Sequence, residues 1–593
     1  METKTKIKVQ SENIFPIIKK WLYSDRDIFV REMVSNACDA ITKFKKLVSV
    51  GEAKTEGEPE YVIDIKCSKK DKYIVFEDNG IGMTAEELDK YINEVAFSGA
   101  EEFLSRYKGD GGGIIGHFGL GFYSSFMVAD KVTIETLSWQ KGAQAVKWSC
   151  DGSTDVKMED CEKEGRGSRI TLFIGSDAKE FADMQRLESV LNKYCAYLPY
   201  TINLTDADQK PKAKDKDKEA ESRVRKINKF PLWTKAVKDC TEEEYKSFYR
   251  EMFMDFNEPL FWIHINVDYP FNLKGILYFP SVELRDFKND GAIKLFNNQV
   301  YVADNIKDVI PEYLLLLRGV LDCPDMPLNV SRSFLQNDGY LAKIKAHITK
   351  KVSEKLKNLY ANEQENYRKY WKTINPFVKY GCMTDDDFYN KIKEAVIFKT
   401  LKDEYINLPE VLKEKTVYYV NDGADMSLYL DNFADKAVLL LDDPIDTHFI
   451  QFLEGQNRDN KFMRVDSDAA LLKESENAVG DDKTEADKII AEFKRVYPDK
   501  NIEAAALKLD LPCVIITGEN ARRMEAMGRI YGMDSSVFKD EKVIVNTAHP
   551  LIKLMGAPDE EAVRLLYNLA RLSNNTLEPA DTSGFVKLIL KKL

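Results

Sequence analysis

The apolar residues between Asp27 and Phe44 recur every three or four positions, which is the spacing of one face of an α-helix. The pattern predicts a helix over this segment, with its apolar stripe packed in a core. The stripe consists of Phe29, Met33, Ala37, Ile41 and Phe44.

A second stripe on the same segment is polar and consists of Glu32, Asn36, Asp39 and Lys43. Steps of three and four residues place these side chains on one side of the predicted helix. Taken alone, such a stripe is most often a solvated surface. The glycine-rich motifs that follow favour a second interpretation, in which the stripe lines a ligand site.

Two short segments after the helix, 61–65 and 73–76, are rich in Val, Ile and aromatic residues and predict paired strands. The second strand runs into the sequence EDNGIGM, where Asp78 precedes Gly80 and Gly82. An acid at a strand end, followed by two glycines, suits a ligand that must approach bare backbone.

A helix is predicted just after these glycines, because Thr84 and Glu87 have the spacing of a capping box. The same glycines also fit the dinucleotide fingerprint G-x-G-x-x-A, which is a weak signal. In this chain the acid precedes the glycines, and the polar stripe lies upstream of them. Both features argue against the dinucleotide interpretation.

The segment 109–121 contains seven glycines in thirteen residues. Its last part, GHFGLG, could present successive N–H groups to phosphates at the start of a helix predicted from Phe122 to Ala129. No G-K-[ST] follows, so the segment is not a Walker P-loop. A flexible surface turn is the alternative for this motif taken alone.

At 593 residues, with 44% hydrophobic and 31% charged residues, the chain should form several globular domains. The sequence QKPKAKDKDKEAES, residues 209–222, predicts a charged linker. A polar stretch near 473–484 marks a second boundary. The predicted domains are 1–208, 223–480 and 484–593.

The net charge of −12 argues against a nucleic-acid partner, which needs a clustered basic surface. Nine cysteines without a C-x-x-C pair predict buried thiols in a reducing compartment rather than disulfides or a zinc site. The chain shows no secretory signal and no membrane-spanning run. We therefore expect a cytoplasmic protein with no membrane partner.

Four motifs occur in a fixed order: REMVSNACDA, DNGIGM, the glycine-rich segment ending in GHFGLGFYS, and GRGSRITLF. Together they resemble the ATP-binding domain of the heat-shock protein 90 family, within the superfamily shared with gyrase, histidine kinases and MutL. The resemblance continues through PLWT and DCPDMPLNVSRSFLQ and spans nearly the whole chain.

The resemblance implies an α/β (α+β) fold with a two-layer, helix-on-sheet ATP-binding domain. A mixed α/β middle domain and a small α/β dimerisation domain should follow. The implied function is that of an ATP-dependent molecular chaperone. It would be a magnesium-dependent ATPase that drives a dimeric clamp cycle on unfolded or partly folded client proteins.

The resemblance also implies roles for single residues. Glu32 is expected to be the general base that deprotonates the attacking water, and Asn36 to hold Mg²⁺ against the ATP phosphates. Asp78 is expected to accept the amino group of adenine, since a base without that donor would leave the carboxylate unpaired. The other residues expected to bind ATP are Asp39, Lys43, Gly82, Met83, Asn93, Gly119, Gly121, Phe122 and Ser168.

Two positions depart from the family pattern. Phe97 stands where the family more often has a lysine before Ser-Gly, and upstream of it Asn93 is the residue that could replace a polar contact. Ser168 stands where threonine is usual, which keeps a hydroxyl on the adenine side.

The sequence LNVSRSFLQ in the second domain resembles the family's catalytic loop. By this resemblance Arg332 reaches the terminal phosphate and Gln336 supports the same site. A guanidinium offers planar, permanently charged donors to a phosphoryl group that gains charge. Because both residues lie beyond the linker, hydrolysis is expected to require docking of the two domains.

The third domain contains an apolar stripe of Met524, Met527, Ile530 and Tyr531. Core packing is the commoner role of such a stripe, but methionines also suit adaptable contacts with clients. Two apolar segments, 565–572 and 585–593, predict helices that need a partner, which a twofold homodimer supplies. The terminal KKL resembles the bacterial type of the family.

Three other functions are open to a chain with these motifs. A topoisomerase or mismatch-repair relative would need a basic DNA surface, and the five histidines show no phosphoacceptor helix of a histidine kinase. A nucleotide-sensing scaffold would bind ATP without turnover. The presence of both Glu32 and Arg332 argues against this third alternative.

Overall fold

The computed structural model describes residues 25–592, except for 56–59, 95–96, 98, 108–112, 117–118, 154, 210–223, 282–292, 305–309, 315–316, 327–337, 422–426, 431–432, 468–482, 532–540, 556–557 and 575. The chain forms two compact units, Met1–Ile348 and Thr349–Leu593. The predicted linker lies outside the described residues apart from Gln209, and the polar stretch at 473–484 apart from its last two residues.

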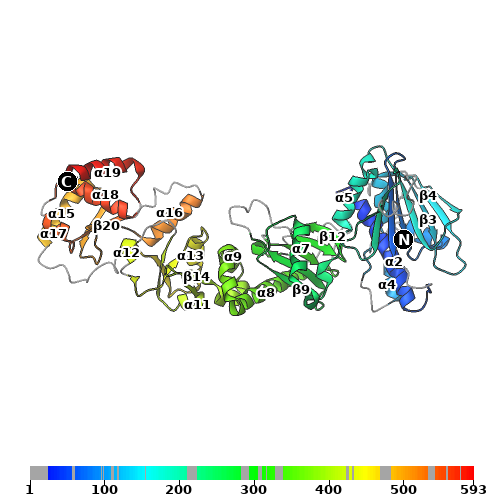
Figure 1. The fold of residues 1–593 in the computed structure, drawn as a ribbon, viewed down its shortest axis with the longest axis horizontal. Helices are drawn as coiled ribbons and strands as arrows, with labels where there is room; N and C mark the ends of the chain where they lie inside the picture. The colour runs from blue at the N-terminus through cyan, green and yellow to red at the C-terminus, as the bar shows by residue number, and fades with distance from the viewer. Residues whose placement is uncertain are drawn as a thin grey trace, which may run out of the picture. The chain divides into compact units, whose positions relative to one another are not determined.

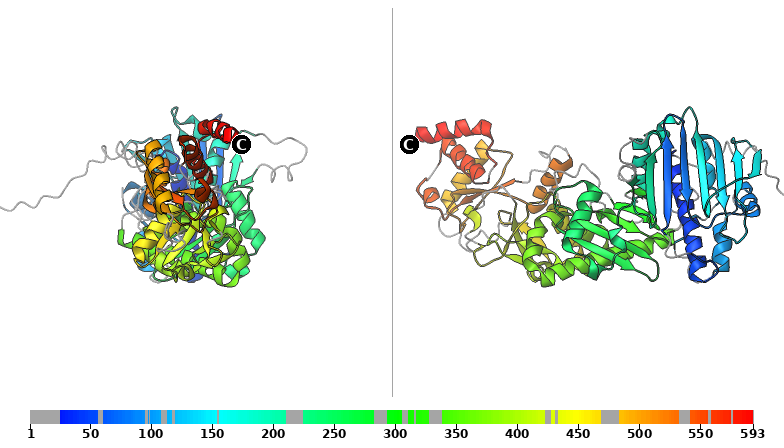
Figure 2. Two further views of the ribbon diagram at one scale, coloured as in Figure 1. Left: turned by 90° about the vertical axis from the view of Figure 1, so that its left-hand side faces the viewer. Right: turned by 45° about the vertical axis from the view of Figure 1, so that its right-hand side comes forward.

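The first unit begins with a sheet that has eight strands among the described residues, in the order β5-β4-β3-β6-β2-β1-β7-β8. Strands β3 and β4 of this sheet are labelled in Figure 1. Neighbouring strands are antiparallel except β1 and β7, which are parallel. Figure 2 shows these strands side by side. The strands are β1 Val62–Ser68, β2 Tyr73–Asp78, β3 Ala129–Leu137, β4 Val146–Cys150, β5 Val156–Asp160, β6 Gly167–Ile174, β7 Thr201–Asp206 and β8 Arg225–Lys226.

Helix α2 (Ile28–Ser49) packs on strands β1 and β2, and α5 (Met184–Tyr194) packs beside it. Every residue of the predicted apolar stripe of α2 is buried, which confirms the helix and its core face. Burial alternates along β2, as expected for a sheet covered by helices on one face. The shorter elements are α3 Ala85–Leu88, the π-helix η3 Asp89–Asn93, α4 Gly99–Arg106, and the 3₁₀-helices η4 Gly121–Met127 and η5 Lys179–Ala182.

The paired strands predicted at 61–65 and 73–76 are confirmed as β1 and β2. The capping box is also confirmed, because the Thr84 hydroxyl accepts from the Glu87 N–H at 3.2 Å and the Glu87 carboxylate accepts from the Thr84 N–H at 2.8 Å.

The element after the glycine-rich segment differs from its prediction. The chain forms the 3₁₀-helix η4 and enters β3 at Ala129, where a helix from Phe122 to Ala129 was expected. Residues Phe122 to Met127 are all buried, so no face of this short segment is exposed to solvent. A 3₁₀ turn spans the distance from the glycine-rich segment to β3 in fewer residues than an α-helix of the same rise would need.

A second sheet in the first unit has the order β12-β11-β13-β10-β9 among the described strands. The ring of Trp233 packs against Tyr197, with centroids 4.9 Å apart, and its indole N–H donates to Asp322 at 3.1 Å. The helices and strands of this part of the first unit are η6 Leu232–Thr234, η7 Val237–Asp239, α7 Glu242–Phe253, β9 Phe261–Val267, β10 Leu273–Phe279, β11 Ile293–Asn297, β12 Val300–Asp304, η9 Glu312–Leu314 and β13 Arg318–Asp322. Helix α8, Asp338–Asn362, spans the boundary of the two units.

The second unit contains three small sheets among its described residues, β14-β15, β17-β16-β18 and β19-β21-β20. Helix α15 begins at Lys483, within the last two residues of the polar stretch. The helices and strands of the second unit are α9 Gln364–Thr384, α10 Asp386–Ile392, η10 Lys393–Ala395, β14 Ile397–Lys399, β15 Tyr405–Asn407, α11 Leu408–Val411, β16 Thr416–Val420, α12 Ser427–Leu430, β17 Val438–Leu440, α13 Asp446–Gln456, β18 Lys461–Arg464, α15 Lys483–Val496, β19 Asn501–Ala505, β20 Cys513–Thr517, α16 Glu519–Tyr531, β21 Glu541–Asn546, α17 Pro550–Met555, α18 Glu560–Ser573 and α19 Pro579–Lys592.

All nine cysteines are free thiols, and seven of them are buried, as the sequence predicted. The two terminal helices predicted from the apolar segments are present as α18 and α19. Among the described helices, none is both long enough and apolar enough to span a membrane.

Candidate functional site

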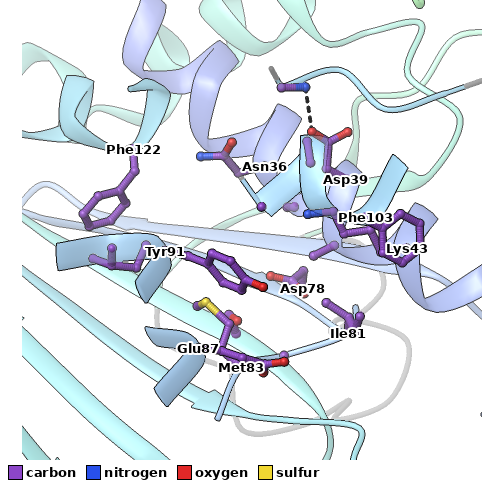
Figure 3. Close-up of a pocket in the computed structure, with 18 of the residues that line it drawn as sticks. Asn36, Asp39, Lys43, Asp78, Ile81, Met83, Glu87, Tyr91, Phe103 and Phe122 are labelled. Carbon is purple, nitrogen blue, oxygen red and sulfur yellow. Dashed lines mark hydrogen bonds between the residues drawn. The ribbon is translucent and has the colours of Figure 1, made fainter. Parts of the chain in front are cut away.

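A cavity of about 790 Å³ lies between the polar stripe of α2 and strands β2, β3 and β6 (Figure 3). The structure brings most of the predicted site residues to its lining. They are Glu32, Asn36, Asp39, Lys43, Asp78, Gly82, Met83, Gly119, Gly121, Phe122 and Ser168.

Among the predicted residues that the structure describes, Asn93 is not in this lining. The Asn93 side chain donates to Asp89 at 2.7 Å and accepts from the Trp148 indole at 2.9 Å. Arg332 and Gln336 lie outside the described residues.

Asp78 stands at the end of β2 and is 6% exposed. Its carboxylate accepts from the Gly80 N–H at 2.8 Å. Burial raises the pKa of Asp78 to about 7, although backbone N–H groups and the charge of Lys163 act in the opposite direction. A buried carboxyl whose charge is only partly balanced by protein groups is a candidate ligand contact.

The polar groups beside Asp78 include two hydroxyls. Ser168 pairs with Asp78 across β2 and β6, and its hydroxyl lies 2.9 Å from that of Thr136. The Thr136 hydroxyl accepts from the N–H of Met83 at 3.0 Å. This chain of contacts fixes the backbone that borders the base end of the cavity.

The glycine at position 82 is required by local geometry. Its φ is +64°, and a Cβ there would lie 1.9 Å from the Leu137 carbonyl oxygen. The backbone of the G-x-G motif therefore packs directly on the end of β3, and no side chain fits between them.

Glu32 is held by its neighbour on α2. The Arg31 guanidinium donates to Glu32 Oε1 at 3.0 Å, and Arg31 itself is buried. The other oxygen, Oε2, faces Gly121, where a Cβ would lie only 2.5 Å away. The carboxylate thus points at the glycine backbone where the sequence predicts the phosphates.

Asp39 connects α2 to the glycine-rich segment. Its two carboxylate oxygens accept from the N–H groups of Ile115 and Gly116, each at 2.7 Å. One turn along α2, burial lowers the pKa of Lys43, although Asp39, Glu87 and Glu102 act to raise it. The Lys43 ammonium lies 5.9 Å from the centre of the Phe103 ring.

Apart from Phe122, the aromatic residues of the lining were not predicted to bind ATP. They are Phe76, Tyr91, Phe97, Phe103, Tyr107 and Trp139. The four-residue spacing of Phe103 and Tyr107 could have indicated one face of a helix. Phe103 lies in α4 and Tyr107 directly follows it, with their ring centroids 4.7 Å apart. Nothing local in the sequence shows that this face turns toward Asp78.

Two family models match the chain. The model described as "Histidine kinase-, DNA gyrase B-, and HSP90-like ATPase" matches residues 24–165, and the model described as "Hsp90 protein" matches residues 203–589. The chain belongs to the heat-shock protein 90 family. The resemblance drawn from the sequence motifs is thereby confirmed.

Similar family members cover nearly the whole chain. Chaperone protein htpG of Bacteroides fragilis (strain YCH46) is 41% identical over 589 residues, covering 94% of this chain and 85% of that protein. Chaperone protein HtpG of Porphyromonas gingivalis (strain W83) is 40% identical, with 95% and 86% covered. That of Wolinella succinogenes is 31% identical, with 95% of each chain covered.

Membership in the heat-shock protein 90 family makes this protein an ATP-dependent molecular chaperone of the stress response that binds and hydrolyses ATP. The predicted fold class is also confirmed, with a histidine-kinase-like ATPase domain followed by the Hsp90 region. Members of the family dimerise and bind client proteins.

Proposed function

We propose that ATP lies along the cavity with its adenine on Asp78 and its phosphates toward Gly119, Gly121 and Glu32. The observation that carries this proposal is that one cavity holds two acids of different character. Asp78 is buried among backbone N–H groups and hydroxyls, whereas Glu32 faces glycine backbone. A group that recognises the adenine base needs the first of these surroundings, and a group that activates water needs the second. Gly82 and Met83 would border the base, and Phe122 would close over the phosphates.

Glu32 would act as the general base. It would accept a proton from the water whose oxygen attacks the terminal phosphorus, while the broken P–O bond leaves its electrons on ADP. The Arg31 contact fixes the direction of the carboxylate. Asp39 would hold the glycine-rich segment in place, and Lys43 would add a positive charge above the sugar.

Magnesium fits the residues on α2, where Asn36 provides an amide oxygen beside the phosphate end. Within the described residues, no three acidic, histidine or cysteine side chains gather to hold a metal by themselves. Magnesium is commonly held by few protein ligands together with substrate phosphates and water. Asn36 would hold it there, and the ion would neutralise phosphate charge.

Arg332 and Gln336 would complete the site from the middle domain, after docking of the two domains. The proposed domains are 1–208, 223–480 and 484–593, with the charged linker at 209–222. Separate family matches that end at residue 165 and begin at residue 203 support a first boundary in this region. In this scheme hydrolysis is controlled by a clamp cycle rather than by ATP binding alone.

We infer that the C-terminal helices form the homodimer interface. Apolar side chains are exposed there at Leu572 of α18 and at Val586 and Leu590 of α19. Such an apolar surface can be covered by the same helices of a second copy. Light scattering of the Val586→Asp/Leu590→Asp variant should report monomers, and a stable dimer would place the interface elsewhere.

Helix α16 would contribute to client binding through Met524, which is 45% exposed. Met527, Ile530 and Tyr531 lie on the same helix, with side chains outside the described set. Arg522 and Arg523 form ion pairs with Asp466, Glu454 and Glu519 and therefore hold the helix in place.

We expect a cytoplasmic protein whose partners are its second copy and its clients, without nucleic acid. Free cysteines and a net charge of −12 support this expectation.

Two variants test the residue roles. Asp78→Asn should abolish ATP binding, because the amide presents a donor to the adenine amino group. Glu32→Ala should keep ATP binding and lose about 10²–10⁴-fold in turnover. Near-normal phosphate release by Glu32→Ala would refute its role as general base, and normal ATP binding by Asp78→Asn would refute the base assignment.

A further inference from the structure

One wall of the cavity is built from two stacked aromatic rings. Tyr91 and Phe97 both line the cavity, with ring centroids 5.9 Å apart and ring planes 19° from parallel. This is an offset stack of the kind that aromatic side chains prefer.

This wall faces the middle of the cavity. The segment that carries it starts at the base end, where the Met83 N–H is bonded to Thr136. It reaches the phosphate end at Phe97, whose carbonyl oxygen would lie 2.3 Å from a Cβ added to Gly119. In the view of Figure 3, Tyr91 lies between Phe122 and Asp78. The covalent structure of a nucleotide places its sugar between base and phosphates, and hence beside Tyr91.

The polar groups of this wall are bonded to one another. The Tyr91 hydroxyl donates to Glu102 at 3.3 Å, and the Lys90 ammonium donates to the same carboxylate oxygen at 2.8 Å. Lys90 lies 5.1 Å from the centre of the Phe97 ring and is not part of the cavity lining. The Tyr91 ring also packs on Gly99, where a Cβ would lie 3.1 Å from it.

On the opposite wall, the polar groups nearest the proposed sugar position already have protein partners. Both oxygens of Asp39 accept backbone N–H groups, from Ile115 and Gly116. The Lys43 ammonium also lines the cavity, lies over the ring of Phe103 and is attracted by Asp39, Glu87 and Glu102, so it is not left unpaired when the 2′-hydroxyl is missing.

We propose that the stacked Tyr91–Phe97 pair makes the nucleotide site indifferent to the 2′-hydroxyl, so that ATP and 2′-deoxy-ATP are bound and hydrolysed alike. A wall that bonds a hydroxyl rejects the analogue without it, because the polar groups of the wall are then left unpaired. An apolar wall leaves nothing unpaired. The inference rests on the proposed placement of adenine on Asp78.

The test compares ATP with 2′-deoxy-ATP on the full-length protein, by equilibrium binding and by kcat/KM for phosphate release. The parent protein should show ratios within about threefold of one, less than the effect of one typical hydrogen bond. The Tyr91→Asn variant introduces an amide at the sugar and should favour ATP by about 5- to 10-fold. Tyr91→Phe keeps the ring and loses only the hydroxyl, so its ratio should equal that of the parent.

A parent protein that prefers ATP by more than about tenfold overturns the inference, and this outcome does not depend on any variant. A change in Tyr91→Phe as large as that in Tyr91→Asn would also overturn it, since the hydroxyl would then be the recognising group. If Asp78→Asn binds both nucleotides as tightly as the parent does, the proposed placement of adenine fails instead. Thermal unfolding of each variant shows that the comparison concerns folded protein.

Discussion

Charged side chains are buried in both units, but their surroundings differ. In the nucleotide cavity, the Asp78 carboxylate accepts from backbone N–H groups, that of Gly80 among them, and burial still raises its pKa to about 7. In the second unit, Asp466 is 0% exposed and accepts two hydrogen bonds from Arg464 and one from Arg522. Burial alone would raise the pKa of Asp466, but these arginines outweigh it and lower the pKa.

The same pairing extends along α16. Glu519 accepts from the Tyr419 hydroxyl, from the Arg464 N–H at 2.9 Å and from Arg523 at 2.8 Å. Arg523 also donates to Glu454. A buried charge that is fully paired with protein groups contributes to the structure. A buried charge that is paired only in part is available to bind a ligand. The four predictions that follow test this distinction.

The largest effect should come from Arg332, the cation that the middle domain is proposed to place at the terminal phosphate of ATP. Arg332→Ala should keep nucleotide affinity and slow hydrolysis by up to about 10³–10⁵-fold, because the guanidinium would contact the phosphoryl group only in the docked state. Steady-state phosphate release measures this.

The isolated fragment 1–208 provides the control for Arg332. It should bind ATP and barely hydrolyse it. Turnover per site equal to that of the intact chain would confine the catalytic site to one domain and remove the link between hydrolysis and closure.

The second prediction contrasts Asp466 with Asp78. Asp466→Asn removes the buried charge that pairs with two partly buried arginines, so the second unit should lose about 3–5 kcal/mol of unfolding free energy. Asp78→Asn removes a partly compensated buried charge and should leave the stability of the unliganded protein unchanged or higher at pH 8. Denaturant unfolding measures both, and equal losses in the two variants would contradict the distinction.

The third prediction concerns pH. The raised pKa of Asp78 means that the folded, unliganded protein favours the neutral carboxyl, so this group stabilises the fold below its unfolded pKa. That contribution is lost as the pH rises from about 4 to about 7. An adenine amino group favours the ionised carboxylate, so ATP binding should release a proton.

ATP affinity should therefore be about tenfold lower at pH 6 than at pH 8, with a plateau above about pH 8. Calorimetry in buffers of different ionisation enthalpy measures the proton release. An affinity independent of pH over this range would show that Asp78 is ionised before ATP binds.

The smallest effect should come from the hydroxyl pair beside Asp78. Ser168→Ala should weaken ATP binding by about fivefold, since it removes one hydrogen bond. Ser168→Thr keeps the hydroxyl and should bind as the parent does. Equal affinities of the Ala and Thr variants would remove Ser168 from the adenine side.

Local patterns in the sequence predicted the parts of the fold that depend on local spacing. The stripe on α2, the strands β1 and β2 and the Thr84–Glu87 capping box each follow from a few neighbouring residues. The residues of the polar stripe reached one cavity because a single helix carries them all.

Contacts between distant segments could not be predicted in this way. Arg522 and Arg523 stand beside methionines in the sequence, and their pairing with Asp466 and Glu454 arises only when α16 packs on β18 and α13. The stack of Tyr91 on Phe97 likewise depends on the π-helix η3 and the turn that follows it. The 3₁₀ geometry of η4 results from burial on every side, which no periodic pattern shows.

The two bonds from Asp39 to the N–H groups of Ile115 and Gly116 have a consequence for hydrogen–deuterium exchange. Both are short, charge-assisted bonds in a glycine-rich stretch, where backbone N–H groups would otherwise exchange quickly. These two amides should be protected for as long as the stretch stays attached to α2. Their exchange rate, read residue by residue, would report how often the stretch leaves the helix, with and without nucleotide.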